Sequence, residues 1–161
     1  MKRKILVFIA ALLILSCSAA FADVPQISSG LMDNAKQALV YLSSGEYERL
    51  VTLLPFSDVS PSATEWQSFA EGNFSSLTGG VQTEYAVAYW TGSIWKIAVP
   101  VSEPSAENVE TLVLTSSDGQ TFSGYRYSTW GDVQGEYPYA SYVVWDREYI
   151  GSVPVITADC R

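Results

Sequence analysis

The chain contains no histidine and only two cysteines among its 161 residues. Without histidine it lacks Ser-His-Asp and Cys-His catalysis, histidine-ligated zinc and the usual proton carrier near neutral pH. Cys17 lies in an N-terminal leader, residues 1–22, and Cys160 is followed only by the last residue. No intramolecular disulfide is expected once the leader is removed, while a free thiol and an intermolecular disulfide at Cys160 both stay open. We expect neither a metal nor a cofactor, so any chemistry would have to use Asp, Glu, Tyr, Lys or Ser.

Basic residues are also scarce, since nine Lys and Arg stand against seventeen Asp and Glu, for a net charge of −8. Removal of the leader would take three basic residues and no acidic one, which brings the net charge to about −11. Binding to phosphate groups needs a basic surface. The composition therefore argues against nucleic acid and anionic membranes as partners.

The first 22 residues have the pattern of a signal peptide. Lys2-Arg3-Lys4 is followed by an unbroken apolar run, Ile5 to Leu15, and then by Ala20-Phe21-Ala22, which a signal peptidase accepts. The apolar run is shorter than the about 20 residues of a permanent membrane span. We therefore expect residues 1–22 to be removed and the processed chain to begin at Asp23. It would be exported to the periplasm or the extracellular space and would have no transmembrane helix.

The same segment allows a second interpretation. Ile14-Leu15-Ser16-Cys17 resembles a lipobox, in which the peptidase cuts before a cysteine that carries lipid. Cys17 would then anchor the protein to a membrane as a lipoprotein. The alternative is that Cys17 is an apolar residue of a discarded leader, and the intact A-x-A site favours that alternative.

Residues 23–161 are expected to form a single α+β domain that begins with three helices. The first runs from Ser28 or Ser29 to Ser44 and ends at Gly45, the second opens at Glu46 and stops at Pro55, and the third precedes Gly72. For the third helix, Ser60-Pro61 could supply a cap with proline at the first helical position, and Ser62 to Glu65 could form a capping box.

From Val81 onward the hydrophobic period changes from 3.6 to 2, which indicates β-strands. Thr91-Gly92-Ser93 and Asp118-Gly119 are hairpin turns, and Gly131 to Glu136 is a polar loop. The predicted fold is three N-terminal helices packed on a curved antiparallel sheet of about six strands. The strand-like runs are residues 80–90, 94–101, 108–116, 120–129, 137–145 and 148–156.

Two segments resemble a known family. The run Ala38 to Leu54, with its Ser44-Gly45-Glu46-Tyr47 knuckle between two helices, and the hairpin segment Gly92 to Ile97 are similar to nuclear transport factor 2-like domains. This cone-shaped α+β superfamily, also called cystatin-like, includes ketosteroid isomerases and polyketide cyclases. The resemblance implies a curved antiparallel sheet around helices with a conical pocket, in an exported member. It carries over no catalytic set, because the acid and the Tyr/Asp pair of the isomerases have no match here.

Three carboxylates are candidates for general acid–base catalysis. Glu84 and Glu110 lie in predicted strands with partly apolar faces, where burial would raise the pKa of a carboxyl group. Asp132 lies in the predicted loop after Trp130. The alternative for all three is a solvated carboxylate near a sheet edge or in a loop.

The aromatic residues favour ligand binding over catalysis. After the leader, Tyr and Trp outnumber Phe by 15 to 4, and aromatic rings with a polar group suit half-wet surfaces. The alternative is that they are ordinary strand formers. Strand alternation predicts that Tyr125 and Tyr127 share a face, opposite Phe122 and Arg126. The candidate ligand-binding residues are Trp90, Trp95, Tyr125, Tyr127, Trp130, Tyr139 and Trp145.

These observations predict an exported, non-catalytic domain that binds a small molecule, peptide or glycan in or beyond the cell envelope. One alternative is a small isomerase, cyclase or lyase that uses a pocket carboxylate with a tyrosine donor. The other is a structural or assembly protein that forms a homodimer through its sheet faces.

Overall fold

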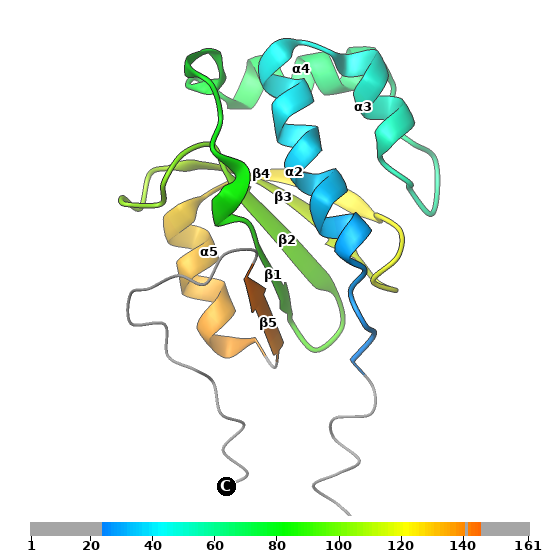
Figure 1. Ribbon diagram of the computed structural model, residues 1–161, viewed down its shortest axis with the longest axis vertical. Helices are drawn as coiled ribbons and strands as arrows, with labels where there is room; N and C mark the ends of the chain where they lie inside the picture. Colours follow the sequence, from blue (N-terminus) through cyan, green and yellow to red (C-terminus); the bar gives the residue numbers. More distant parts are fainter. Residues whose placement is uncertain (1–23, 141, 146–161) are drawn as a thin grey trace, which may run out of the picture.

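The computed structural model describes residues 24–140 and 142–145, in which helices come first and an antiparallel sheet follows (Figure 1). The expected leader with Cys17, the strand predicted over 148–156 and Cys160 lie outside these residues. The three expected N-terminal helices are present as α2 (Ser29–Ser44), α3 (Tyr47–Leu53) and α4 (Ala63–Asn73). Within the two described ranges, no helix combines the length and apolar character that crossing a membrane would need.

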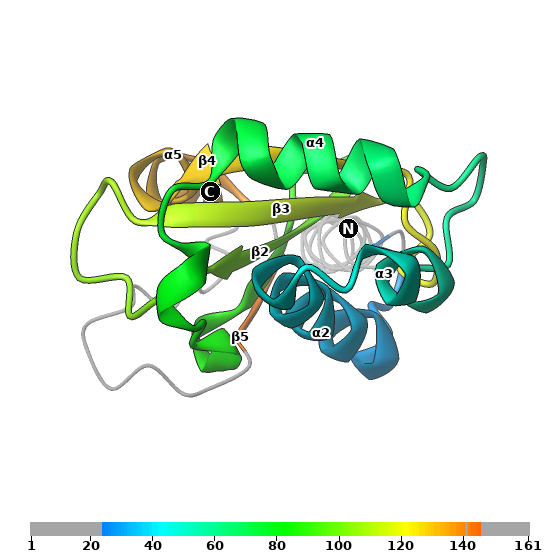
Figure 2. The same ribbon diagram turned by 90° about the horizontal axis from the view of Figure 1, so that it is seen from above.

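The helix boundaries follow the local signals. Gly45 ends α2 with a φ of 72°, a left-handed conformation that glycine adopts without a Cβ clash. At α4 the capping box is Ser62 with Glu65, not Ser60-Pro61: the Glu65 N–H donates to Ser62 Oγ (3.3 Å), and the Ser62 N–H donates to Glu65 Oε2 (2.7 Å). The helix also passes Gly72 and ends one residue later. Figure 2 shows α2 and α4 diverging, with β3 visible between them.

Five strands form one antiparallel sheet in the described part of the chain: β1 (Val87–Trp90), β2 (Trp95–Pro100), β3 (Glu110–Ser116), β4 (Gly124–Thr129) and β5 (Tyr142–Trp145). Their order is β4-β3-β2-β1-β5, so β5 returns to pair with β1. Both predicted hairpins are confirmed. The Thr91 N–H donates to Ile94 O (3.0 Å) in the first, and Gly119 has a φ of 72° in the second.

The first strand is shorter than the alternation predicted. The connection after α4 runs through two short 3₁₀ helices, η1 (Leu77–Gly79) and η2 (Thr83–Tyr85). Residues 80–86, which were expected to be strand, belong to this connection. Only from Val87 does the chain pair with β2. The fourth strand likewise begins at Gly124 instead of at residue 120, because Asp118 draws the chain into a wide turn by accepting hydrogen bonds from Gln120 N (2.8 Å) and Thr121 N (2.8 Å).

The prediction of a loop over 131–136 and of a strand beginning at 137 is wrong. The chain forms the helix α5 (Trp130–Glu136), followed by the 3₁₀ helix η3 (Tyr137–Tyr139). A second capping box begins α5, in which Thr129 Oγ1 accepts from the Asp132 N–H (3.3 Å) and Asp132 Oδ2 accepts from the Thr129 N–H (3.4 Å). In Figure 1, α5 lies on the other side of the strands from α2.

The sheet buries two separate hydrophobic clusters because side chains alternate along each strand. Leu112 and Leu114 of β3 pack with α2–α4, in the larger cluster. Val113 between them points the other way and packs with Trp130 and Val133 of α5 in the smaller cluster. The sheet is therefore covered on both faces, whereas the sequence predicted helices before the sheet only.

Candidate functional site

Glu110, the first residue of β3, supports the chain that follows α4. Its carboxylate accepts hydrogen bonds from the Ser75 N–H (2.9 Å), Ser75 Oγ (2.7 Å), the Ser76 N–H (3.0 Å) and Ser76 Oγ. Partial burial acts to raise the pKa of Glu110, but the hydrogen bonds from Ser76 and Ser75 outweigh it, so the pKa lies below its usual range. A carboxylate held ionised by four donors is a weak general base.

The other two catalytic candidates have different surroundings. Glu84 lies in η2 and is exposed, not inside a strand with a partly apolar face as predicted. Asp132 is exposed and holds the Thr129 N–H in the capping box of α5. The three carboxylates are thus carried by different elements, and the contacts of Glu110 and Asp132 are those of structural caps.

Three of the candidate tryptophans are core residues. Trp90, at the end of β1, and Trp95, at the start of β2, pair across the hairpin with ring centroids 5.7 Å apart. The Trp95 indole N–H donates to Pro25 O (2.7 Å), which holds the N-terminal segment against the sheet. Trp130, the first residue of α5, is 2% exposed and packs against the other face of the sheet.

The remaining aromatic candidates differ in exposure. Tyr125 and Tyr127 of β4 are half-buried, and Tyr139 of η3 is 90% exposed. Trp145 ends β5 opposite Val87, and its side chain lies outside the described part of the structure. The six candidates whose side chains are described therefore do not share one surface: they are distributed over both faces of the sheet and a helical turn.

Tyr125 and Tyr127 share a face opposite Arg126, as alternation predicted, but Phe122 lies on the tyrosine side. The centroid of the Phe122 ring is 6.0 Å from that of Phe56, and the centroid of the Phe56 ring is 6.3 Å from that of Tyr125. The two-residue alternation does not extend back to Phe122, because two consecutive residues of the chain face Thr115. Gly124 pairs with Thr115 in the ladder, and the Ser123 N–H also donates to Thr115 O (2.8 Å). This extra residue is a β-bulge, which shifts the side chains before it to the other face.

Trp66 of α4 lies at the centre of the aromatic cluster on the helix-covered face. The centroid of its ring is 4.1 Å from that of Tyr125 and 5.8 Å from that of Phe69. The side chain is fully buried, and its indole N–H has no hydrogen-bond acceptor among the described residues. A buried donor without a partner costs about 1–3 kcal/mol, which the ring packing must offset.

On the opposite face, Glu136 at the end of α5 joins three strands. Its Oε2 accepts from Tyr89 Oη (2.7 Å) and Lys96 Nζ (2.7 Å), and its Oε1 accepts from Arg126 (3.0 Å). Burial acts to raise the pKa of Glu136, but the bonds from Lys96 and Tyr89 and the two cationic charges outweigh it and lower the pKa. Burial, followed by the bond to this carboxylate, raises the pKa of Tyr89. The group therefore holds an ionised Glu136 and a protonated tyrosine.

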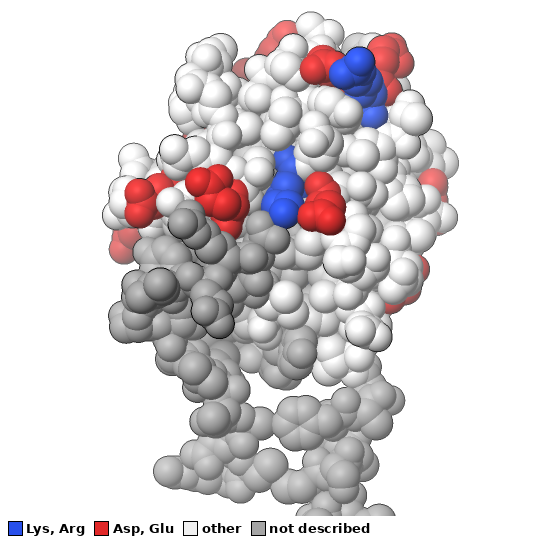
Figure 3. Space-filling view, viewed as in Figure 1, with Lys and Arg blue, Asp and Glu red and all other residues white. Residues whose placement is uncertain are grey.

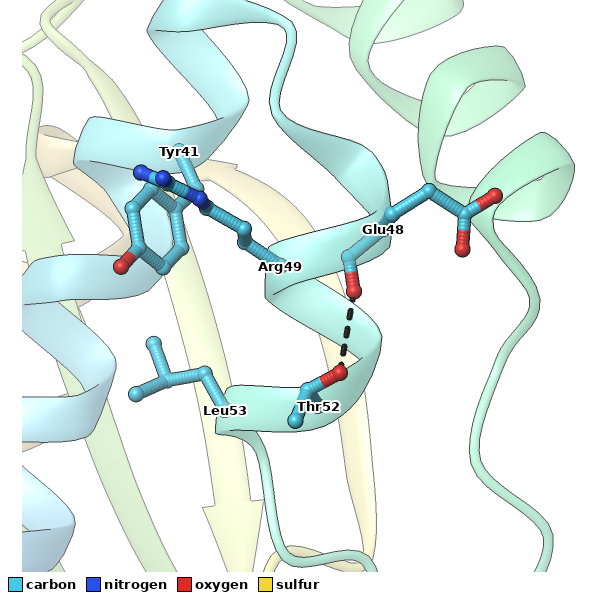
Figure 4. Close-up of a pocket in the computed structure, with 5 residues that line it drawn as sticks. All are labelled: Tyr41, Glu48, Arg49, Thr52 and Leu53. Atoms are coloured by element: carbon cyan, nitrogen blue, oxygen red, sulfur yellow. Dashed lines mark hydrogen bonds between the residues drawn. The ribbon is translucent and has the colours of Figure 1, made fainter.

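An open hollow of about 620 Å³ lies between α2 and α3. Tyr41 comes from α2, and Glu48, Arg49, Thr52 and Leu53 come from α3. In Figure 4, Arg49 and Leu53 point toward Tyr41, whereas the side chain of Glu48 points away. The guanidinium carbon of Arg49 is 5.9 Å from the centroid of the Tyr41 ring, a cation–π contact, and Thr52 Oγ1 donates to Glu48 O (3.2 Å).

Cationic side chains are few in the described residues, and each forms an ion pair. Lys36 pairs with Asp33 (3.1 Å) and Arg49 with Glu46 (2.6 Å), while Lys96 and Arg126 share Glu136. On the face shown in Figure 3, the blue cationic groups accordingly lie beside red carboxylates. Residues 24–140 and 142–145 contain 13 Asp and Glu but only 4 Lys and Arg, so the remaining acidic groups dominate the surface potential.

Comparison with family models, curated proteins and solved structures finds no match for this chain. The resemblance to nuclear transport factor 2-like domains therefore stays a prediction, based on two sequence segments. A function for this protein has to be inferred from its fold and from the contacts of the described residues.

Sequence reasoning missed the hollow and the Glu136 group for different reasons. Tyr41 and Arg49 belong to the segment singled out for its resemblance, but their pairing depends on how α3 turns back after Gly45. Glu136 falls in a segment whose polar composition predicted a loop. The signal that could have found it is the Thr129-x-x-Asp132 capping pattern, because a helix over 130–136 would place Glu136 near the sheet.

Proposed function

We propose that this protein is a non-catalytic binding domain, exported to the cell envelope or beyond, and that it holds a small amphipathic ligand such as a sugar or a peptide side chain. The observation that carries this proposal is the open hollow between α2 and α3, where a tyrosine, an arginine and a leucine converge. Export rests on the leader pattern in the sequence.

The hollow combines the two kinds of surface that small-ligand sites use. Tyr41 and Leu53 provide an apolar wall, and Arg49 and Thr52 provide hydrogen-bonding groups at its rim. The side chain of Arg49 is 68% exposed and extends over the tyrosine ring, so its outer N–H groups can meet a hydroxyl or carboxylate. A ligand with one apolar and one polar side fits this arrangement.

The test is ligand-observed NMR with the full chain and a panel of simple sugars and short aromatic peptides, each at about 1 mM to detect weak binding. We expect at least one member of the panel to show saturation transfer, and Arg49→Ala to weaken its binding about fivefold or more. The matched control is Lys36→Ala, which also removes a cation from an i,i+3 ion pair but lies outside the hollow. An equal effect of the two substitutions, or no binding by the whole panel, would contradict the proposal.

The best arrangement for the enzymatic alternative is Glu136 beside Tyr89, a carboxylate and a tyrosine donor 2.7 Å apart. It matches the residue types expected for an isomerase, cyclase or lyase. However, Lys96 and Arg126 help to lower the pKa of Glu136, which makes the carboxylate a weaker base. The binding role is therefore the one we favour. The assembly alternative through sheet faces is less favoured, because helices of the same chain pack on both faces.

A further inference from the structure

Strand β4 lies at one end of the sheet, and its outer edge is a row of backbone groups. Among the described residues, β4 has a strand neighbour on one side only, β3. The Trp130 N–H donates toward β3, to Val109 O (2.8 Å), and the preceding Thr129 N–H points away, to Asp132 Oδ2 (3.4 Å). Because successive residues of a strand alternate, the backbone N–H and C=O of Tyr127 and Tyr125 also point away from β3. We call these four groups the β4 edge.

The chain already uses the beginning of this edge for β-type pairing. The Phe122 N–H donates to Pro55 O (2.8 Å), and the Ser57 N–H donates to Phe122 O (2.8 Å), so residues 55–57 form an isolated parallel bridge with Phe122. The chain then leaves toward α4, which begins at Ala63. The outer edge therefore accepts an extended segment at Phe122.

The surroundings of the β4 edge are acidic on one face and balanced on the other. Asp132 Oδ2 accepts from the outward Thr129 N–H (3.4 Å), Glu110 pairs with Thr129 across β3 and β4, and Glu65 precedes Trp66, whose ring centroid is 4.1 Å from that of Tyr125. In keeping with this placement, burial followed by the charge of Glu65 raises the pKa of Tyr125, and burial followed by the charges of Glu110 and Asp132 raises that of Tyr127. The carboxylates of Glu65, Glu110 and Asp132 form no salt bridge within the described residues. On the opposite face, the cation of Arg126 is paired with Glu136.

From this charge pattern we propose that the β4 edge binds an extended, lysine- or arginine-bearing peptide segment of another protein as an added strand. Side chains of an added strand alternate between the two faces of the sheet. The residues on the Tyr125 and Tyr127 side lie beside two aromatic rings and within reach of the charges of Glu65, Glu110 and Asp132, which favour cations. The residues on the Arg126 side meet a cation that is already paired. The preferred segment therefore carries its cationic residues at alternate positions, separated by uncharged β-formers. This site is separate from the hollow between α2 and α3.

The experiment measures binding of labelled synthetic peptides to the full chain by fluorescence anisotropy at low and at physiological salt. One peptide alternates Lys with Thr, a second has the same residues in two blocks, and a third alternates Glu with Thr. We expect the alternating lysine peptide to bind most tightly and the glutamate peptide not to bind. Tyr127→Pro should lower the affinity about tenfold or more, because proline removes an outward N–H without disturbing the ladder to β3. Tyr127→Val, which keeps that N–H, should lower it less.

A second set of variants tests the charges without depending on whether Tyr127→Pro folds. Glu65→Gln combined with Asp132→Asn removes two charges, while the amide oxygens still serve the capping boxes of α4 and α5. We expect this pair to weaken peptide binding roughly threefold to tenfold. The matched control is Asp33→Asn with Glu84→Gln, which changes the net charge equally on α2 and η2 and should leave the affinity unchanged.

Two results would overturn the proposal. If the block peptide binds as tightly as the alternating one, and the control pair weakens binding as much as the test pair, attraction is due to net charge and not to strand addition. If no peptide binds while the chain forms a dimer that Tyr127→Pro dissociates, the β4 edge is occupied by a second copy of the protein.

Discussion

The two faces of the sheet are held to their helices by different forces. The face under α2–α4 is apolar and aromatic, with Trp66, Phe122 and Leu112 all fully buried. The face under α5 has a smaller apolar cluster, and beside it Glu136 accepts from Tyr89, Lys96 and Arg126. The first face depends on buried apolar area, which does not change with the ionisation of a side chain. The second depends in part on one ionised carboxylate, so the two should respond differently to substitution and to acid.

Neighbouring residues of β3 test this contrast most directly, since Leu112 and Val113 are both fully buried but face opposite clusters. We expect Leu112→Ala to cost about 2–5 kcal/mol of the free energy of unfolding. Val113→Ala removes fewer carbons and should cost about 2 kcal/mol. Urea unfolding followed by tryptophan fluorescence measures both. Equal losses would show that the two clusters contribute equally despite their different size.

Glu136→Gln tests the polar attachment of α5. The substitution leaves Lys96 and Arg126 without a counter-charge. It should cost about 1–2 kcal/mol of the free energy of unfolding, in the lower part of the range for an unpaired buried group, because about a third of the Glu136 side chain is exposed. The pKa of Glu136 is lowered in the folded protein, so its stabilisation is present above the unfolded-state pKa of about 4.3 and is lost as the pH falls through the folded-state value.

The difference in stability between wild type and Glu136→Gln should therefore be largest near neutral pH and shrink below about pH 4. Thermal unfolding across that pH range measures it. The control is Glu84→Gln, an exposed carboxylate of η2, whose effect should be small. A constant difference at all pH values would mean that Glu136 acts through packing and not through its charge.

Two buried tryptophans give a matched comparison within the larger cluster. The Trp95 N–H donates to Pro25 O, whereas the Trp66 N–H has no acceptor among the described residues. Replacement by phenylalanine removes a hydrogen bond at Trp95 but an unsatisfied donor at Trp66. We expect Trp95→Phe to cost about 1 kcal/mol more than Trp66→Phe in chemical unfolding. A larger loss at Trp66 would indicate that its N–H has a partner in the folded protein.

The smallest expected effects concern the two capping boxes, one for a helix on each face. Ser62→Ala at α4 and Thr129→Ala at α5 each remove an N-cap oxygen and should cost about 1 kcal/mol. Amide hydrogen exchange then shows whether α5 unfolds on its own or together with the sheet. If α5 folds together with the sheet, Thr129→Ala lowers protection throughout the strands, and if α5 opens locally, protection falls only over 130–136.

The local order of elements could be predicted from the sequence because it depends on neighbouring residues. Gly45 ends α2, Ser62 with Glu65 begins α4, and the two glycine-containing turns connect their strands as expected. The errors lie where a weak alternating pattern was extended too far, at residues 80–86 and 120–123. At 131–136 the polar composition concealed the capping box of a helix. A period of two is easily mimicked over a few residues, and hydrogen bonds to a nearby turn or cap then decide the conformation.

The candidate sites were less predictable than the fold. Trp90, Trp95, Tyr125 and Tyr127 lie in strands as expected, but Trp130 lies in α5 and Tyr139 in η3. Alternation alone also does not tell a core face from a ligand-facing one. Trp90, Trp95 and Trp130 became core residues on two different faces. The acidic candidates were chosen by residue type, whereas the carboxylate that gathers the most charged partners, Glu136, depends on strands that lie 10 to 47 residues away.

The sequence by itself determined the helices α2–α4, the hairpin turns, the acidic charge and the absence of histidine chemistry. These follow from composition and from contacts between residues a few positions apart. Only the tertiary structure decided that α5 covers the second face, that Phe122 shares a face with Tyr125, and that Arg49 extends over Tyr41. The physical reason is that each of these depends on which way a segment turns after a bulge, a cap or a glycine. A small local rotation there moves a side chain to the other face of the sheet or onto another helix.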